Sequence, residues 1–241
     1  MKISNATVLV TGANRGLGRA LVAASLRAGA ARVYAAARDI HKLDAVVAQD
    51  RTRIVPLALD VTSARDIEAV SERAKDVTIL VNNAGTLASY GLLSSAVADI
   101  ATDFAVNFHG PLALTRALLP ALERAKGAAI VNILSVVSLA SRPVIGAYGA
   151  SKAAMFSATQ GLRAELKAKS IDVHAVFPGA IDTDMIRAFP IAKTSAEDVA
   201  AAIVDGIVKG DEDILPDGMG RDVFASWAKD PKAFERYFGS L

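Results

Sequence analysis

Short runs of continuously apolar residues recur along the chain and alternate with longer segments of helical spacing. A run that is apolar at every position, rather than at every second one, is typical of a strand buried on both faces. Such strands form parallel sheets, and helices make the crossovers between them. We predict strands at residues 7–12, 32–38, 53–60, 78–85, 128–135, 172–179 and 213–216. We predict helices at residues 17–30, 63–75, 94–126, 148–169 and 195–209.

Pro56 indicates where the third predicted strand lies in the sheet. Proline has no N–H to donate to a neighbouring strand, so within a sheet it belongs on an edge. In the doubly wound order 3-2-1-4-5-6-7 the third strand is an edge strand, so the two inferences agree. We therefore predict an α/β fold over residues 1–241, a single-domain Rossmann-type parallel sheet with helices on both faces. We expect the helix at 94–126 to bend near Gly110 and Pro111.

Composition excludes several classes of protein. The 241 residues are 52% hydrophobic but only 5% aromatic, which suits a core of Ala, Val, Leu and Ile. The net charge is +2 and the basic residues are scattered, so we expect no nucleic-acid partner. Cysteine is absent, and His41, His109 and His174 lie far apart, so we expect neither a disulfide nor a metal site. The apolar run near the N-terminus is too short for a signal peptide or a membrane span, so we predict a cytoplasmic protein with no membrane partner.

A glycine-rich turn, TGANRGLG, joins the first predicted strand to the first predicted helix at residues 11–18. Gly12 permits a tight turn, Gly16 lets the backbone approach a pyrophosphate, and Gly18 permits close helix packing. The free N–H groups at the start of the helix then face the phosphates. Because the turn stands between a strand and a helix, it predicts a nucleotide site rather than an ordinary turn.

The segment YGASK places Tyr148 and Lys152 four residues apart, on one face of a predicted helix. Free tyrosine has a pKa of about 10, which is too high for efficient proton transfer near neutral pH. We expect the lysine cation and the positive nicotinamide of an oxidised cofactor to lower that pKa. The alternative is a buried tyrosine and a solvated lysine that share a turn by chance.

Ser135 ends the fifth predicted strand, thirteen residues before Tyr148. Ligands of this fold bind at the carboxyl ends of the strands, so its hydroxyl can hold a substrate carbonyl oxygen beside the tyrosine. The alternative is a serine that caps a helix or a turn. With Lys152 and the glycine-rich turn, these residues together favour catalysis.

The motifs resemble, in order, those of the short-chain dehydrogenase/reductase family, whose fingerprint is Thr-Gly-x3-Gly-x-Gly. The matching segments are TGANRGLG (11–18), LDV (59–61), NNAG (82–85), VNFHG (106–110), ILS (133–135), YGASK (148–152) and PGAIDT (178–183). The resemblance implies hydride transfer between a nicotinamide cofactor and a carbonyl compound or alcohol. It covers about residues 5 to 210.

The resemblance also implies roles for individual residues. The implied catalytic residues are Asn107, Ser135, Tyr148 and Lys152. The implied cofactor contacts are Gly12, Asn14, Arg15, Gly16, Leu17, Gly18, Arg38, Asp60, Val61, Asn83, Ala84, Gly85, Tyr148, Lys152, Pro178, Gly179, Ile181 and Thr183. In the family the lysine also holds the nicotinamide ribose, and the asparagine bends its helix and holds a water. A simple kink beside Gly110 is the other interpretation of that asparagine, and both can be true.

The end of the second predicted strand, YAAARD at residues 34–39, bears on the choice of cofactor. An acidic residue at this strand end binds the ribose 2′-hydroxyl of NAD, whereas an arginine accommodates the 2′-phosphate of NADP. Here Ala37 stands where the acid would be, Arg38 follows it, and Asp39 comes too late to face the ribose. With Arg15 close by, we predict that NADP(H) is preferred over NAD(H). The alternative is that both arginines are solvated surface charges.

The substrate-binding residues that we expect are Ser135, Val137, Ile145 and Tyr148, with Tyr90, Val136, Ile186 and Phe189 as further candidates for the pocket. Most are apolar, which by resemblance of position favours an apolar or aromatic ketone or aldehyde, or the matching secondary alcohol. A non-catalytic NADP(H)-binding redox sensor or scaffold is the alternative, although such relatives usually lack the tyrosine or the lysine. An extended-branch epimerase or dehydratase needs a larger C-terminal domain than this chain has.

Two further predictions concern assembly. We expect a homodimer through the helices at 112–126 and 149–168, with a tetramer as the alternative, because the second helix carries small residues around much of its circumference. The segment 217–241 departs from the family pattern, which usually ends in a glycine-rich strand. It carries Val223, Phe224, Trp227, Phe234, Tyr237 and Phe238. These apolar residues either pack on the sheet edge or serve assembly or closure of the pocket.

Overall fold

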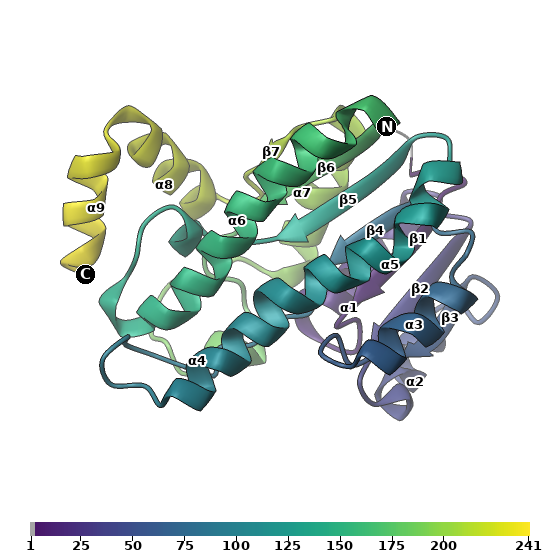
Figure 1. Ribbon diagram of the computed structural model, residues 1–241, viewed down its shortest axis with the longest axis horizontal. Coiled ribbons are helices and arrows are strands. Elements are labelled where there is room, and N and C mark those ends of the chain that lie inside the picture. The colour runs from purple at the N-terminus through teal and green to yellow at the C-terminus, as the bar shows by residue number, and fades with distance from the viewer. Residues whose placement is uncertain (1–2) are drawn as a thin grey trace.

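Seven parallel strands form one sheet in the order β3-β2-β1-β4-β5-β6-β7, as the sequence predicts (Figure 1). The computed structural model describes residues 3–241. The strands are β1 (Thr7–Thr11), β2 (Arg32–Ala37), β3 (Ile54–Ala58), β4 (Ile79–Asn82), β5 (Ala128–Ile133), β6 (Ile171–Val176) and β7 (Asp213–Ile214). Pro56 lies on the edge strand β3, opposite Ala35 of β2, which confirms the prediction from its missing N–H.

Helices cover both faces of the sheet (Figure 1). The α-helices are α1 (Gly16–Arg27), α2 (Asp44–Val47), α3 (Ala64–Arg73), α4 (Val97–Phe104), α5 (Gly110–Arg124), α6 (Gly146–Leu166), α7 (Ala196–Lys209), α8 (Gly218–Lys229) and α9 (Pro231–Gly239). One apolar core lies between the sheet and the pair α1 and α7, and another lies between the sheet and α3, α5 and α6. Both faces of the strands are therefore buried, as continuous apolar runs require. No helix within residues 3–241 is long and apolar enough to cross a membrane.

The predicted helix at 94–126 is divided by a π-helical turn, Ala105–His109, between α4 and α5. The irregularity therefore comes just before Gly110 and Pro111 rather than at them. π-Helical turns are rare and occur often at functional sites. Here the turn contains Asn107.

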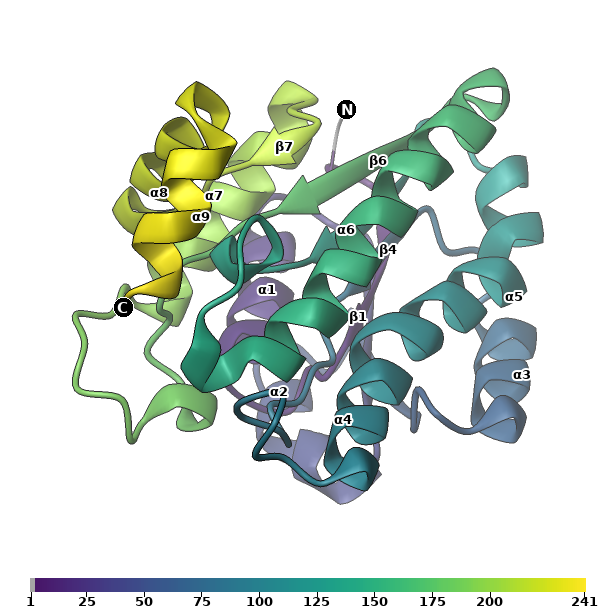
Figure 2. The ribbon, with the colours of Figure 1, turned by 60° about the vertical axis from the view of Figure 1, so that its left-hand side comes forward.

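The segment 217–241 forms two helices that the sequence did not delimit. Asp217 caps α8 by accepting a hydrogen bond from the Gly220 N–H at 2.7 Å. Asp230 caps α9, and Pro231 occupies its first position, where a missing N–H costs nothing. Figure 2 shows α8 and α9 (yellow) side by side, next to the teal loop that precedes α6.

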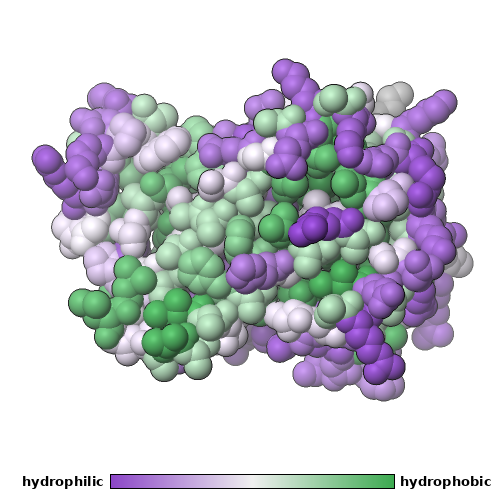
Figure 3. Space-filling view, viewed as in Figure 1, coloured by the Kyte–Doolittle hydropathy of each residue, from purple (hydrophilic) through white to green (hydrophobic). Residues whose placement is uncertain are grey.

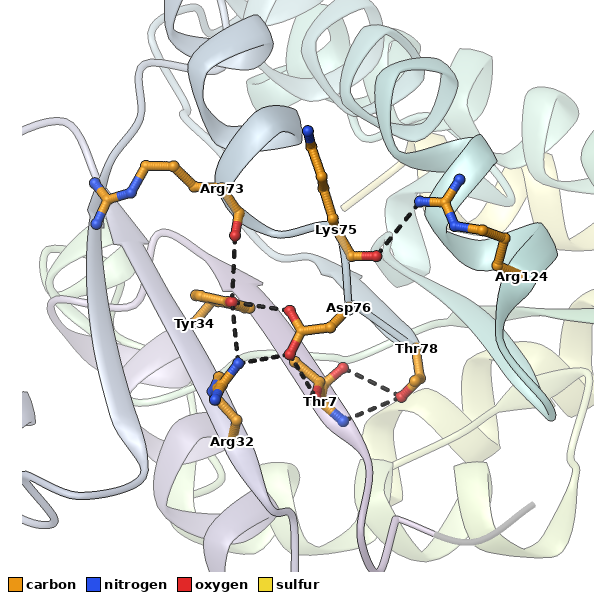
Figure 4. A network of polar contacts seen from close by, with 8 residues as sticks. All are labelled: Thr7, Arg32, Tyr34, Arg73, Lys75, Asp76, Thr78 and Arg124. Atoms are coloured by element: carbon orange, nitrogen blue, oxygen red, sulfur yellow. Dashed lines mark hydrogen bonds and ion pairs between the residues drawn. The ribbon is translucent and has the colours of Figure 1, made fainter.

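A polar network ties three strands together at their amino ends (Figure 4). The Tyr34 hydroxyl donates to Asp76 at 2.8 Å, and Arg32 pairs with the same carboxylate at 2.6 Å. Thr78 accepts from the Thr7 N–H at 3.1 Å and so joins the start of β1 to the residue before β4. These bonds help to hold the register at the end of the sheet opposite the one where ligands of this fold bind.

Candidate active site

A cavity of about 860 Å³ lies at the carboxyl ends of the strands. All eighteen residues expected to contact a cofactor line it, and so do Ser135, Val137, Ile145 and Tyr148, the residues expected to contact a substrate. The sheet topology explains why these residues lie together, because the carboxyl ends of parallel strands meet at one edge of the sheet. One hollow thus has room for both a dinucleotide and a reactant.

The glycine-rich turn forms one side of this cavity. Gly12 and Gly16 have φ values of +65° and +51°, a conformation that side chains disfavour. A Cβ on Gly18 would overlap the carbonyl oxygen of Gly12, so this position requires glycine. Thr11 Oγ1 accepts hydrogen bonds from the N–H groups of Asn83 and Ala84, both at 2.9 Å, and binds the turn to the loop after β4. The start of α1 therefore faces the cavity without side chains in the way, which fits a pyrophosphate.

The end of β2 also contributes to the cavity wall. Ala37 and Arg38 line the cavity, and Asp39 instead caps the following 3₁₀ turn by accepting from the His41 N–H at 3.1 Å. Burial raises the pKa of Asp60, but hydrogen bonds from Thr62 and the charge of Arg38 outweigh burial and lower it. The charge of Arg38 thus acts within the cavity.

Tyr148 and Ser135 both line the cavity, and Ser135 lies close enough to lower the pKa of the Tyr148 phenol. Lys152 Nζ lies 5.9 Å from the centre of the Tyr148 ring and donates to the Ile133 carbonyl at 2.8 Å. The Ser135 hydroxyl also accepts from the Val137 N–H at 3.4 Å, at the start of a short 3₁₀ helix. Ser135 therefore caps a turn, as the alternative interpretation expected, and it also lines the cavity together with Tyr148.

The pKa of Tyr148 moves in the direction opposite to the prediction. Burial raises it, and the nearby charge of Asp103 raises it further, whereas the hydrogen bond with Ser135 lowers it. Burial also lowers the pKa of Lys152 to about 8, against the opposing charge of Asp103. The phenol is therefore protonated at neutral pH, the form that can donate a proton.

Asn107 is 1% exposed and does not line the cavity, so the expected catalytic set is divided. Its Oδ1 accepts from the Thr86 N–H at 2.9 Å, and its Nδ2 donates to the Thr86 carbonyl at 2.9 Å and to Ser151 Oγ at 3.0 Å. Ser151 in turn donates to the Tyr148 carbonyl at 2.7 Å. Asn107 thus connects the π-helical turn, the loop after β4 and α6 from behind the cavity wall.

Asp103 is a residue of this region that the sequence did not reveal. It lies one helical turn before Asn107 and is fully buried. Its carboxylate accepts hydrogen bonds from the Ala88 N–H at 2.8 Å, the Ser89 N–H at 3.1 Å and the Ser89 hydroxyl. Asp103 and Asn107 together fasten residues 86–89, and Thr86 and Leu87 of that segment line the cavity. The available signal in the sequence was the spacing of four residues between Asp103 and Asn107, because residues four apart lie on one face of a helix.

The substrate end of the cavity is mostly apolar. Of the further pocket candidates, Val136, Ile186 and Phe189 line it, but Tyr90 does not. Tyr90 is 58% exposed, because the backbone turns there: its N–H donates to Ser95 and its carbonyl accepts from Ala147. The expectation that Tyr90 contributes to the pocket was therefore wrong.

The C-terminal helices supply part of the wall. Phe234 and Phe238 of α9 are buried in one cluster with Val136, Val137 and Tyr148. Phe238 also lines the cavity. Of the alternatives for segment 217–241, the structure thus shows the chain packing on itself beside Tyr148, with Phe238 of α9 in the cavity wall.

The fold and this site define a class of nucleotide-dependent oxidoreductase. Residues 6–193 match the family model described as short chain dehydrogenase. The chain therefore belongs to the short-chain dehydrogenase/reductase family.

Particular relatives resemble the chain over most of its length. It is 32% identical over 197 residues to the short chain dehydrogenase pigC of Monascus ruber, covering 76% of this chain and 65% of that protein. A short chain dehydrogenase of Burkholderia cenocepacia J2315, solved with NADP, is 34% identical with a TM-score of 0.92 over 99% of both chains. A short chain dehydrogenase/reductase of Burkholderia phymatum, solved with NAD, is 24% identical with a TM-score of 0.88, covering 97% of this chain and 96% of that one. The last likeness is one of fold.

Proposed function

We propose that the protein transfers hydride between NADP(H) and a carbonyl compound or secondary alcohol, with Tyr148 as the general acid and base. The observation that carries this proposal is that Ser135, Tyr148 and Lys152 line the same cavity, with Lys152 one turn further along α6 and its Nζ 5.9 Å from the centre of the Tyr148 ring. The glycine-rich turn and the open start of α1 fit the pyrophosphate of a dinucleotide, because a side chain at Gly18 would fill that cradle. A bound nicotinamide supplies or accepts the hydride.

The side chains of this protein supply the other parts of the reaction. In reduction, Tyr148 donates its proton to the carbonyl oxygen, and Ser135 donates a hydrogen bond to the oxygen as negative charge develops on it. Lys152, in its protonated form, favours the phenolate that remains. In oxidation the phenolate takes the proton back from the alcohol, so the same residues serve both directions.

The substrate class follows from the cavity walls. Val136, Val137, Ile145, Ile186 and Phe189 present apolar surface beside Tyr148. Such a wall favours an apolar or aromatic ketone or aldehyde, because binding then removes apolar surface from water on both sides.

Preference for NADP(H) is the second part of the proposal. It is supported by Ala37 at the end of β2, by Arg38 in the cavity, and by Asp39, which is engaged elsewhere. The NADP bound to the Burkholderia cenocepacia relative is consistent with it. Arg15 also lines the cavity, and in this structure it pairs with Asp184 at 3.2 Å.

Assembly as a homodimer through α5 and α6 is the third part. A Cβ on Gly161 of α6 would meet nothing within 4 Å, so a second helix has room to approach closely. Figure 3 shows a broad, weakly hydrophobic area over the middle of α5 and α6. An isologous contact would cover this area in both copies.

The test of the catalytic proposal uses a panel of carbonyl compounds and alcohols, with both cofactors, followed by nicotinamide absorbance. Tyr148→Phe is expected to retain the fold and bind the nucleotide, but to lose turnover by about 10²–10⁴-fold, since the acid is removed. A Phe variant with the wild-type rate would contradict the role of Tyr148. Nucleotide binding without turnover of any substrate would favour the redox sensor or scaffold.

A further inference from the structure

Arg142 is a charged side chain in the otherwise apolar substrate end of the cavity. It lies in the loop between Ser135 and Tyr148, directly before Pro143. Its guanidinium carbon is 5.9 Å from the centre of the Phe238 ring. Because Phe238 belongs to the same buried cluster as Tyr148, Arg142 and the proposed acid share one wall.

The guanidinium group of Arg142 is incompletely paired. Its Nη2 donates to the Leu241 carbonyl at 3.2 Å. Its Nε is buried and has no hydrogen-bond partner among residues 3–241. Arginine cannot give up its proton at accessible pH, so this donor remains charged and unsatisfied.

The other cations of the cavity differ from Arg142 in this respect. Arg15 forms an ion pair with Asp184, Arg38 lies near the carboxylate of Asp60, and Lys152 donates to a backbone carbonyl. A buried donor without an acceptor costs about 1–3 kcal/mol, and more for a charged group. An acceptor in the cavity that pairs with the Nη groups would partly compensate this charge, so the site favours an anionic ligand.

We propose that Arg142 binds a carboxylate of the substrate, so that the preferred substrates are apolar or aromatic oxo acids and the matching hydroxy acids. A carboxylate has two oxygens at the spacing of two guanidinium N–H groups, so it can pair with the two Nη groups of Arg142. This inference rests on the proposed function and specifies its substrate class. Among the described residues that line the cavity, the one carboxylate is that of Asp60, beside Arg38, whereas Asp103 lies behind the wall at Tyr148.

The competing explanation is that Arg142 only fastens α9. Its bond to the Leu241 carbonyl and its contact with Phe238 both serve that purpose. Neither contact uses Nε, however. The two explanations differ in their consequences, because a fastener affects charged and neutral substrates alike, whereas a recognition residue affects the charged ones.

The experiment compares 3- and 4-formylbenzoate with their methyl esters, which keep the aldehyde and ring but lack the charge. For the wild type we expect kcat/KM to favour the acids. Arg142→Met should lower kcat/KM for the acids by about 10- to 100-fold, the loss of a charge-assisted contact, and leave the esters nearly unchanged. An equal loss for acids and esters would overturn the proposal and leave Arg142 as a fastener of α9.

Two controls separate recognition from damage. Arg236→Met removes the same charge from the exposed side of α9 and should change neither series. Trp227, the one tryptophan of the chain, packs beside the cluster of Phe234 and Phe238, so its fluorescence reports whether the C-terminal helices keep their place in Arg142→Met.

Calorimetric titration of 4-(hydroxymethyl)benzoate and its methyl ester gives a readout that needs no turnover. Binding of the acid alone, weakened by Arg142→Met, would support the inference even if no aldehyde were reduced, in which case the proposed reaction would be the part that failed. Equal binding of acid and ester to the wild type would overturn the inference, whatever the rates.

Discussion

Removal of the Asp103 carboxylate is expected to affect both stability and catalysis. Asp103 is fully buried, and Ser89, which gives it two of its three hydrogen bonds, is 1% exposed. In Asp103→Ala the N–H and the hydroxyl of Ser89 lose their acceptor without gaining water. At about 1–3 kcal/mol for each buried donor, the free energy of unfolding should fall by roughly 2–6 kcal/mol.

Asp103→Asn separates the charge from the hydrogen bonds. One oxygen remains for Ser89, while the new amide faces the Ala88 N–H as a second donor, so we expect a loss of roughly 1–3 kcal/mol. The negative charge that raises the pKa of Tyr148 and of Lys152 is gone. Both pKa values should therefore fall, and the alkaline limb of the pH profile of kcat/KM for reduction should move to lower pH.

Urea denaturation and the pH profile are the two assays. Asp99→Ala, on the exposed first turn of the same helix, is the matched control and should change neither. The reasoning is refuted if the free energy of unfolding of Asp103→Ala lies within about 0.5 kcal/mol of the wild-type value, which is the usual effect of a surface substitution. It is also refuted if the alkaline limb of the pH profile stays in place in Asp103→Asn.

The remaining predictions concern the cofactor, the pH dependence of stability and assembly. Arg38→Ala should weaken NADPH by about 10- to 100-fold in kcat/KM and NADH much less, and adding Ala37→Asp should reverse the preference; equal effects on both cofactors would contradict the role of Arg38. Burial lowers the pKa of His174, so the folded state binds fewer protons than the unfolded state and stability should decline as pH falls below about 6.5. His174→Asn, which can still donate to the Asp211 carbonyl, should show a smaller fall in Tm between pH 7 and pH 5. Light scattering should find a dimer for the wild type and a monomer for Gly161→Arg, and a wild-type monomer at micromolar concentration would count against the interface.

The main architecture could be predicted because it depends on local patterns. Continuous apolar runs mark strands buried on both faces, and Pro56 alone indicates which of them is at the edge. The glycine turn, Ser135 and the pair on α6 were recognisable for the same reason, since each motif lies next to the strand or helix that positions it.

What the sequence did not show depends on contacts between distant segments. The π-helical turn accompanies the bonds from Asn107 to Thr86, 21 residues away, and Asp103 resembles an ordinary polar residue of a helix until its partners at 88 and 89 are known. The upward shift of the Tyr148 pKa has the same origin, because burial and Asp103 cause it together. Tyr90 failed as a pocket residue because the direction of a side chain in a loop depends on backbone bonds that no local pattern specifies.

The position of α9 has a consequence for engineering. The family model matches residues 6–193, which include the glycine-rich turn, Ser135, Tyr148 and Lys152, whereas Phe234 and Phe238 lie beyond that segment and still pack beside Tyr148. Exchange of residues 217–241 for the tail of another family member would therefore change the shape of the cavity beside Tyr148 while leaving the residues of the proposed reaction in place. A library randomised in this short terminal segment is a compact way to redirect the enzyme toward new reactants.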